Sequence, residues 1–118
     1  MWIMVSGPYT AGNAGPERRA KNLMAMNDAA LELFRAGHQP IIGVNMALPI
    51  IEAAGGGEDA YDEIMMPLCL DLADRCDACL RVGGPSKGAD DEVERFKARG
   101  RPVYRSVDEV PKVDLSSR

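Results

Sequence analysis

The sequence predicts one α/β domain, in which helices cover both faces of a parallel β-sheet of four to five strands. Short apolar runs alternate along the chain with segments whose apolar residues recur at helical spacing. Such alternation of strands and helices is typical of a parallel sheet. The chain has 118 residues, which suits one domain with one core, and no linker or repeat divides it. We therefore expect one domain over residues 1–111 and a loose C-terminal tail over residues 112–118.

The first third of the chain predicts a strand, a long loop and a helix. Residues 2–5 are apolar throughout, as in a central parallel strand. The loop over residues 6–15 is rich in Gly and turn formers, and Pro16 suits the first turn of a helix. An apolar stripe at helical spacing follows, and Gly37 favours the end of this helix.

The middle of the chain predicts a second strand, a long helix and a third strand. The second strand covers residues 39–44. Residues 45–57 carry no clear signal beyond one turn of helix and a flexible Gly-rich end. A helix is expected over residues 58–75, where Pro67 either bends it or divides it in two. The third strand covers residues 77–82.

The last part of the chain joins a loop rich in Gly, Pro and Ser to a helix, a tight turn and a short strand over residues 102–105. A Gly- and Ser-rich turn before a helix presents free backbone N–H groups, which can bind an anion such as phosphate. Glu92 lies near the start of this helix, where a carboxylate can act as a nucleophile or a general base. A structural role fits the same residues, with Ser86 capping the helix and the acidic residues favouring its dipole.

Three loop segments are expected to meet at the carboxyl ends of the strands. They cover residues 6–15, 45–57 and 83–88. Ligands of open α/β sheets bind at this edge, so the coincidence favours a binding site there. Asn45, directly after the second strand, is a candidate for the pocket wall.

Composition and charge exclude several classes of function. The net charge is −4 and the pI about 4.9, which argues against a nucleic-acid surface. No apolar run approaches the length of a membrane span, and the apolar N-terminus lacks the basic lead of a signal peptide. With an odd count of three cysteines, we expect a cytoplasmic protein. Cys76 and Cys79 stand at a helix end, where packing thiols are expected instead of a redox pair or a zinc site.

Two strings carry a resemblance to a known family. The first is Ser6-Gly7-Pro8-Tyr9, and the second is Ser86-x-Gly88-x-x-x-Glu92, followed by Gly-Arg-Pro-Val over residues 100–103. Together they resemble the nucleoside 2-deoxyribosyltransferase superfamily, which includes nucleoside monophosphate N-glycosidases. The resemblance covers nearly the whole chain.

The resemblance implies a single-domain flavodoxin/Rossmann-like three-layer sandwich. It also implies cleavage of the N-glycosidic bond of a nucleoside or nucleoside 5′-monophosphate, or deoxyribosyl transfer, without metal or cofactor. Glu92 would attack the anomeric carbon, and Ser86 and Gly88 would hold the 5′ end of the sugar or its phosphate. Ser6, Gly7, Pro8 and Tyr9 would line the base and sugar site. A close carboxylate suits this chemistry, because glycosidic cleavage passes through an oxocarbenium-like state.

A second catalytic carboxylate is the weak part of the pattern. Relatives often carry an Asp on the helix before the third strand, and strict spacing puts Cys69 at that position. Asp71 and Asp74 are nearby, but their side chains would point in different directions, because helical neighbours two apart do not share a face. Asp62 could substitute only if a bend at Pro67 brings it round. A catalytically silent nucleotide-binding module on the same fold is therefore the alternative function.

The expected partners are a small-molecule nucleoside or nucleotide and a second copy of the chain, with no nucleic acid and no membrane. Residues 45–51 and the helix over residues 58–75 carry much aliphatic surface for so small a domain. We expect these two segments at or near the interface of a homodimer, close to the pocket beside Glu92.

Overall fold

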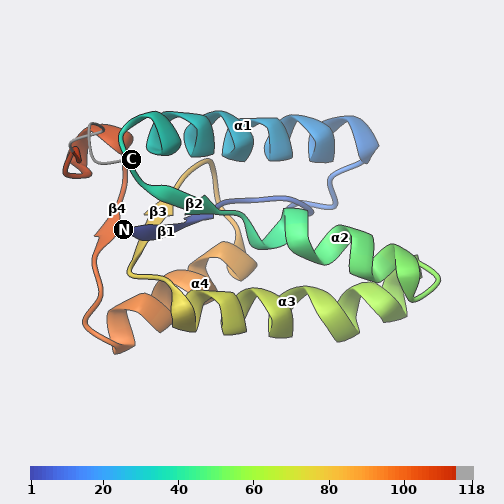
Figure 1. The fold of residues 1–118 in the computed structure, drawn as a ribbon. Helices are drawn as coiled ribbons and strands as arrows, with labels where there is room; N and C mark the ends of the chain where they lie inside the picture. Colours follow the sequence, from blue (N-terminus) through green and yellow to red (C-terminus); the bar gives the residue numbers. More distant parts are fainter. Residues whose placement is uncertain (114–118) are drawn as a thin grey trace.

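The computed structural model describes residues 1–113 and has the α/β fold that the sequence predicts (Figure 1). Its sheet has four parallel strands in the order β2-β1-β3-β4, which confirms the prediction and is consistent with a flavodoxin/Rossmann-like sandwich. The strands are β1 (Trp2–Ser6), β2 (Gln39–Ile41), β3 (Ala78–Arg81) and β4 (Val103–Tyr104). The helices are α1 (Pro16–Arg35), α2 (Gly43–Ala53), α3 (Gly57–Arg75), α4 (Lys87–Ala98) and the short 3-10 helix η1 (Val107–Glu109).

The helices form two layers around the sheet (Figure 1). Side chains alternate between the faces of β1, so that Ile3 and Val5 pack with α1 while Met4 packs with α2, α3 and α4. Both faces of the central strands are therefore buried, which explains why β1 and β3 read as apolar runs.

The main difference from the sequence prediction is α2. Residues 43–53 form a helix, where the sequence indicated two more strand residues, no more than one turn of helix and the start of a flexible stretch. The helix contains Pro49, so local propensity argues against it. Tertiary packing outweighs that propensity, because Ala47 and Ile51 are buried against the sheet and α3. Gly43 permits this approach, since a Cβ there would lie 2.5 Å from the Sγ of Cys69.

The flexible stretch predicted around residues 53–57 is a tight turn between α2 and α3. Gly55, Gly56 and Gly57 have φ values of 99°, 70° and 87°, a region that glycine adopts without strain. The following helix α3 continues unbroken through Pro67, so of the two expected possibilities at this residue, a bend or a division, the division does not occur. As a result, α2 and α3 form a hairpin that reaches beyond the sheet on the side of the strands' carboxyl ends (Figure 1).

The chain end packs against α1 as far as the structure describes it. The N–H of Val113 donates to the carbonyl oxygen of Ala36 at 3.0 Å. Of the predicted tail, residues 114–118 lie outside the described residues. Within the part that is described, no helix is both long enough and apolar enough to cross a membrane.

Candidate active site

A cavity of about 250 Å³ lies at the carboxyl ends of β1 and β3, where the sequence predicts a ligand site. The loop after β1 and the first turns of α4 line one side, with Gly7, Tyr9, Ser86, Gly88 and Glu92 among them. Helix α3 lines the other side through Tyr61, Met65, Met66 and Cys69. The structure thus brings together most of the residues that the sequence predicts for the site.

Glu92 occupies the second turn of α4 on the face that packs into the protein. Its neighbours on this face are Ala89, Val93 and Phe96, and Glu92 itself is 8% exposed. The hydroxyl of Ser6 donates to its Oε1 at 3.1 Å. Burial raises the pKa of Glu92 to about 7, against the opposing effects of the Ser6 hydrogen bond and the Arg81 charge. Glu92 therefore changes its charge near neutral pH.

Ser6 links Glu92 to the centre of the sheet. It is the last residue of β1, is 1% exposed and is paired in register with Arg81 of β3. The Sγ of Cys79 donates in turn to the Ser6 hydroxyl at 3.5 Å. The register of β1 and β3 thus sets the position of the hydroxyl that holds the carboxylate.

Arg81, which the sequence analysis missed, fastens the loop before α4. Its side chain is buried, Nε lies 3.3 Å from Asp90 Oδ1, and Nη2 donates to the carbonyl oxygen of Gly84 at 2.7 Å. Nη1 donates to the carbonyl oxygen of Val82. One guanidinium therefore ties the end of β3, the loop and the start of α4 together. An arginine at the end of an otherwise apolar strand is the feature of the sequence that could have indicated this role.

The Ser-Gly-Pro string of the first loop serves close packing as well as the pocket. A Cβ on Gly7 would lie 3.0 Å from the carbonyl oxygen of Val82, so only glycine fits without displacement. Pro8 packs against Gly83, where a Cβ would lie 2.8 Å from the proline Cδ. Pro8 is thus placed to hold the two loops together, and Tyr9 continues into the pocket wall.

The helix start of α4 has the features of an anion site. Ser86 caps the helix by accepting from the N–H of Ala89 at 3.2 Å. The N–H groups of Lys87 and Gly88, at the first two helical positions, have no intrahelical acceptor. The acidic residues nearby are engaged elsewhere, since Asp90 pairs with Arg81 and the Lys87 ammonium lies 3.0 Å from Asp91. Two of the three acids beside the helix start are therefore neutralised by a partner.

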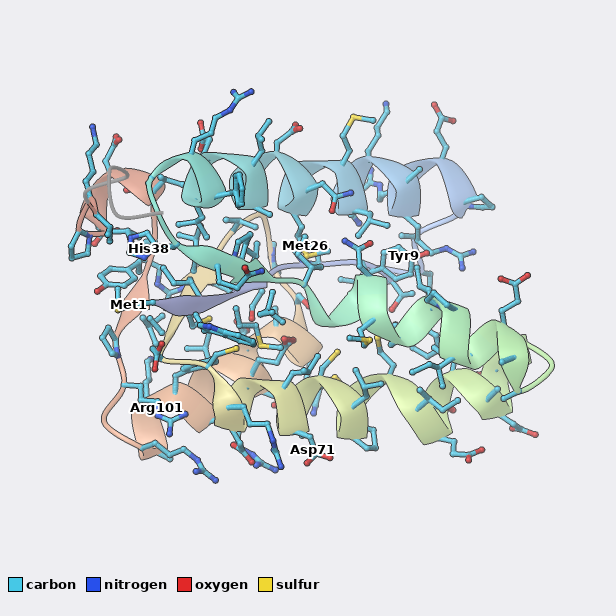
Figure 2. The ribbon with its side chains drawn as sticks, viewed as in Figure 1. Met1, Tyr9, Met26, His38, Asp71 and Arg101 are labelled. Carbon is cyan, nitrogen blue, oxygen red and sulfur yellow. The ribbon has the colours of Figure 1, made fainter. Side chains whose placement is uncertain are left out.

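Asp71 does not join this site. It lies on the exposed side of α3 and borders a separate groove with Pro67 and Arg75, away from the sheet (Figure 2). Cys69, two positions earlier and about 200° around the helix, lines the pocket instead. Burial, with the nearby charge of Glu92 as a smaller cause, raises the pKa of the Cys69 thiol to about 12. The pocket therefore has a neutral thiol at the place expected for a second carboxylate.

Asn45 is also placed elsewhere. Because α2 begins at Gly43, Asn45 stands on a helix and its Nδ2 donates to Asn27 Oδ1 of α1 at 2.8 Å. Val44, its neighbour, lines the pocket in its place. Across residues 1–113, no group of three or more His, Cys, Asp or Glu side chains is arranged to hold a metal ion.

We predict that the three cysteines are unreactive in the folded protein. Burial is the main cause that raises the pKa of Cys76 and of Cys79 to about 11, so at about pH 8 the thiolate fraction is on the order of 0.001. A chromogenic disulfide reagent should react slowly in buffer and with three thiols after unfolding in denaturant. Cys76→Ala combined with Cys79→Ser should lower the free energy of unfolding without abolishing activity. Fast reaction of a thiol in the folded protein, or about one zinc per chain, would contradict this prediction.

We also predict that the burial of Glu92 makes stability depend on pH. Its pKa in the folded protein is about 7, against 4.5 for an ordinary glutamate, so the unfolded chain loses this proton first as the pH rises. The stability that goes with a protonated Glu92 is therefore fully present below pH 4.5 and is lost as the pH rises through about 7. The glutamine of Glu92→Gln cannot titrate. The free energy of unfolding of this variant should therefore rise by about 1–3 kcal/mol relative to that of the wild type between about pH 4 and about pH 8.

Urea unfolding at the two pH values measures this difference. Glu94→Gln is the matched control, because Glu94 is exposed on the same helix and should show no such gain. If the stability of wild type and of Glu92→Gln depends on pH in the same way, Glu92 is ionised at little cost in the folded protein, which would contradict the prediction.

Comparison with known proteins adds no family assignment. No family matches the chain, and no curated protein is similar enough to count as a relative. What can be said about the chemistry of this site therefore comes from its own residues and their geometry.

Proposed function

We propose that the protein cleaves the N-glycosidic bond of a nucleoside or a nucleoside 5′-monophosphate, with Glu92 as the nucleophile. The observation that carries this proposal is a buried carboxylate, held by Ser6 Oγ at 3.1 Å, in a pocket beside a Ser-capped helix start. The resemblance of the Ser-Gly-Pro-Tyr and Ser-x-Gly-x-x-x-Glu strings to nucleoside 2-deoxyribosyltransferases supports the same reaction. We propose that the chain is a small relative of these enzymes.

The reaction proceeds in two displacements at the anomeric carbon C1′. The Glu92 carboxylate attacks C1′ while the bond from C1′ to the base nitrogen breaks, and the base leaves with the electron pair and takes up a proton. Water then attacks C1′, loses a proton and releases the carboxylate, which yields the free sugar from a nucleoside or the sugar 5′-phosphate from a monophosphate. In deoxyribosyl transfer, a second base takes the place of water. In both versions the leaving base takes its proton from solvent water and the acceptor returns one to solvent, so no metal or cofactor enters the balance.

The surroundings of Glu92 suit a nucleophile. The Ser6 hydroxyl donates to one oxygen, and the opposing effects of this hydrogen bond and Arg81 leave its pKa at about 7 despite burial. A carboxylate that is poorly solvated reacts more readily than one in water, because less solvent has to be displaced. The free N–H groups at the start of α4 would bind the 5′ hydroxyl or phosphate of the sugar.

A catalytically silent nucleotide-binding module is the second candidate, and the position of Cys69 favours it. A second carboxylate would assist departure of the base, and Cys69, which lines the pocket from α3, is a neutral thiol. Under this alternative, the protein binds nucleotides in the same pocket and releases no base.

We predict that Glu92→Gln abolishes base release while ligand binding is largely kept. The amide preserves the size of the side chain and the acceptor for Ser6 but removes the attacking charge, so the rate should decrease by at least about 1,000-fold. In the wild type, kcat/KM should rise with pH through about 7 and then level off, because the ionised form attacks. Chromatography of free base from a panel of nucleosides and monophosphates measures both effects.

Glu94→Gln serves again as the control and should retain the wild-type rate. Unchanged turnover in Glu92→Gln would remove Glu92 from the mechanism. Binding of a nucleotide without base release from any member of the panel would favour the silent module.

We propose that the protein acts as a cytoplasmic homodimer. Its three buried free thiols suit a reducing compartment. Met46 and Ile50 of α2 are 54% and 43% exposed, and Leu72 of α3 borders both the groove beside Met46 and the groove along Pro67. An apolar surface of this kind commonly marks a contact between subunits. The same two helices line the Glu92 pocket, so a contact here would lie close to the site.

We predict that light scattering at micromolar concentration gives twice the chain mass of 12.8 kDa. Met46→Asp should produce monomers, because it places a charge in the apolar contact. Leu31→Asp is the matched control, since Leu31 is 46% exposed on α1, which covers the other face of the sheet, and should leave the dimer intact. A wild type of monomer mass would contradict the dimer, and an unchanged dimer in Met46→Asp would contradict the interface.

A further inference from the structure

A second hollow adjoins the Glu92 pocket, and the reaction at C1′ does not account for it. It has a volume of about 730 Å³ and lies between the loop after β1, the first turn of α1 and the hairpin of α2 and α3. Tyr9, Thr10 and Tyr61 border both spaces, and Thr10 Oγ1 lies 3.3 Å from the Tyr61 hydroxyl. The two spaces are therefore neighbours that share one wall.

The Glu92 pocket by itself is small for a whole substrate. Its volume is about 250 Å³, whereas ligand sites usually measure about 300–1,000 Å³. If the sugar lies beside Glu92 for attack at C1′, the base has to extend beyond this pocket. The adjoining hollow offers Tyr9, Tyr61 and Leu48 as aromatic and apolar surface, which is suited to a flat heterocyclic ring.

Three charged side chains face this hollow without a partner of opposite charge. They are Arg19 of α1 and the two carboxylates of α3, Glu58 and Asp62. Within residues 1–113, none of the three forms an ion pair, and the Nε of Arg19 is buried without a hydrogen-bond partner. Arg19 also lies in the first turn of α1, where the helix dipole disfavours a cation. Donors on one side and acceptors on the other indicate a ligand that carries both.

We propose that this hollow binds a 6-oxopurine, guanine or hypoxanthine, as the base of the substrate, an inference that rests on the proposed function. A guanidinium only donates, and its fork matches the adjacent O6 and N7 acceptors of these bases. Ionised carboxylates only accept, and the N1–H of the same bases, with the 2-amino group of guanine, supplies donors to Asp62 or Glu58. Adenine carries a 6-amino donor in place of O6, which would face the donors of Arg19. Arg19 is therefore the residue that selects oxo over amino purines.

The test compares wild type, Arg19→Met and Arg18→Met against one matched pair of purines. Arg18→Met is the control, because it removes the same charge from the adjacent position, which is exposed and borders a different hollow. Calorimetry measures the binding of free hypoxanthine and adenine, and chromatography measures base release from 2′-deoxyinosine and 2′-deoxyadenosine. We expect wild type and Arg18→Met to prefer the oxo purine by about 10- to 100-fold, and Arg19→Met to lose this preference. A merely structural role of Arg19 would weaken both purines equally and leave their ratio unchanged.

The two readouts separate this inference from the proposed function. Selective binding of hypoxanthine that depends on Arg19, without base release, would support the ligand assignment and contradict the glycosidase. Base release without an oxo preference, or with a preference that survives in Arg19→Met, would overturn the role of Arg19 and leave the glycosidase standing. If the protein neither binds a purine nor releases base, both the ligand assignment and the proposed function are overturned.

Discussion

The burial of one carboxylate on the apolar side of a helix is the constraint on which the candidate site depends. Glu92 stands where α4 would otherwise present another aliphatic residue to the sheet, between Ala89 and Phe96. An ionised group in such a place is costly unless hydrogen bonds replace its water shell. The Ser6 hydroxyl supplies one such bond, and the nearby Arg81 guanidinium offers further electrostatic support. The remaining arrangement of the loops can be understood as holding these partners in place.

The central strands therefore serve two purposes. Ser6 and Arg81 are paired in the register of β1 and β3, so the backbone ladder that builds the sheet also aligns the two side chains that act on Glu92. Arg81 in turn fastens the carbonyl oxygens of Val82 and Gly84, which sets the loop entering α4. A shift of one residue in this register would turn Ser6 to the opposite face of the sheet and separate it from Glu92. The stability of the sheet and the geometry of the site are thus coupled.

The α2–α3 hairpin gives the pocket its second wall and its extension. Close approach at Gly43 lets α2 pack on α3 near Cys69, and Tyr61 of α3 meets Thr10 across the mouth of the pocket. Beyond this contact lie Arg19 and Asp62, which come from different layers of the fold. The site therefore combines a part at the sheet edge with a part made by the hairpin.

The sequence was sufficient to predict the order of the strands and of α1, α3 and α4, and the string from Ser86 to Glu92, because these depend on apolar periodicity and on turn and capping residues close together in the chain. It did not indicate α2, since the packing of Ala47 and Ile51 outweighs the local effect of Pro49. The contacts between the side chains of the site follow from tertiary packing. Ser6 and Glu92 are 86 residues apart, and helical phase turns Cys69 toward the pocket and Asp71 away from it. Contacts of this kind depend on strand register and on the rotation of packed helices, and neither can be predicted from a local pattern of residues.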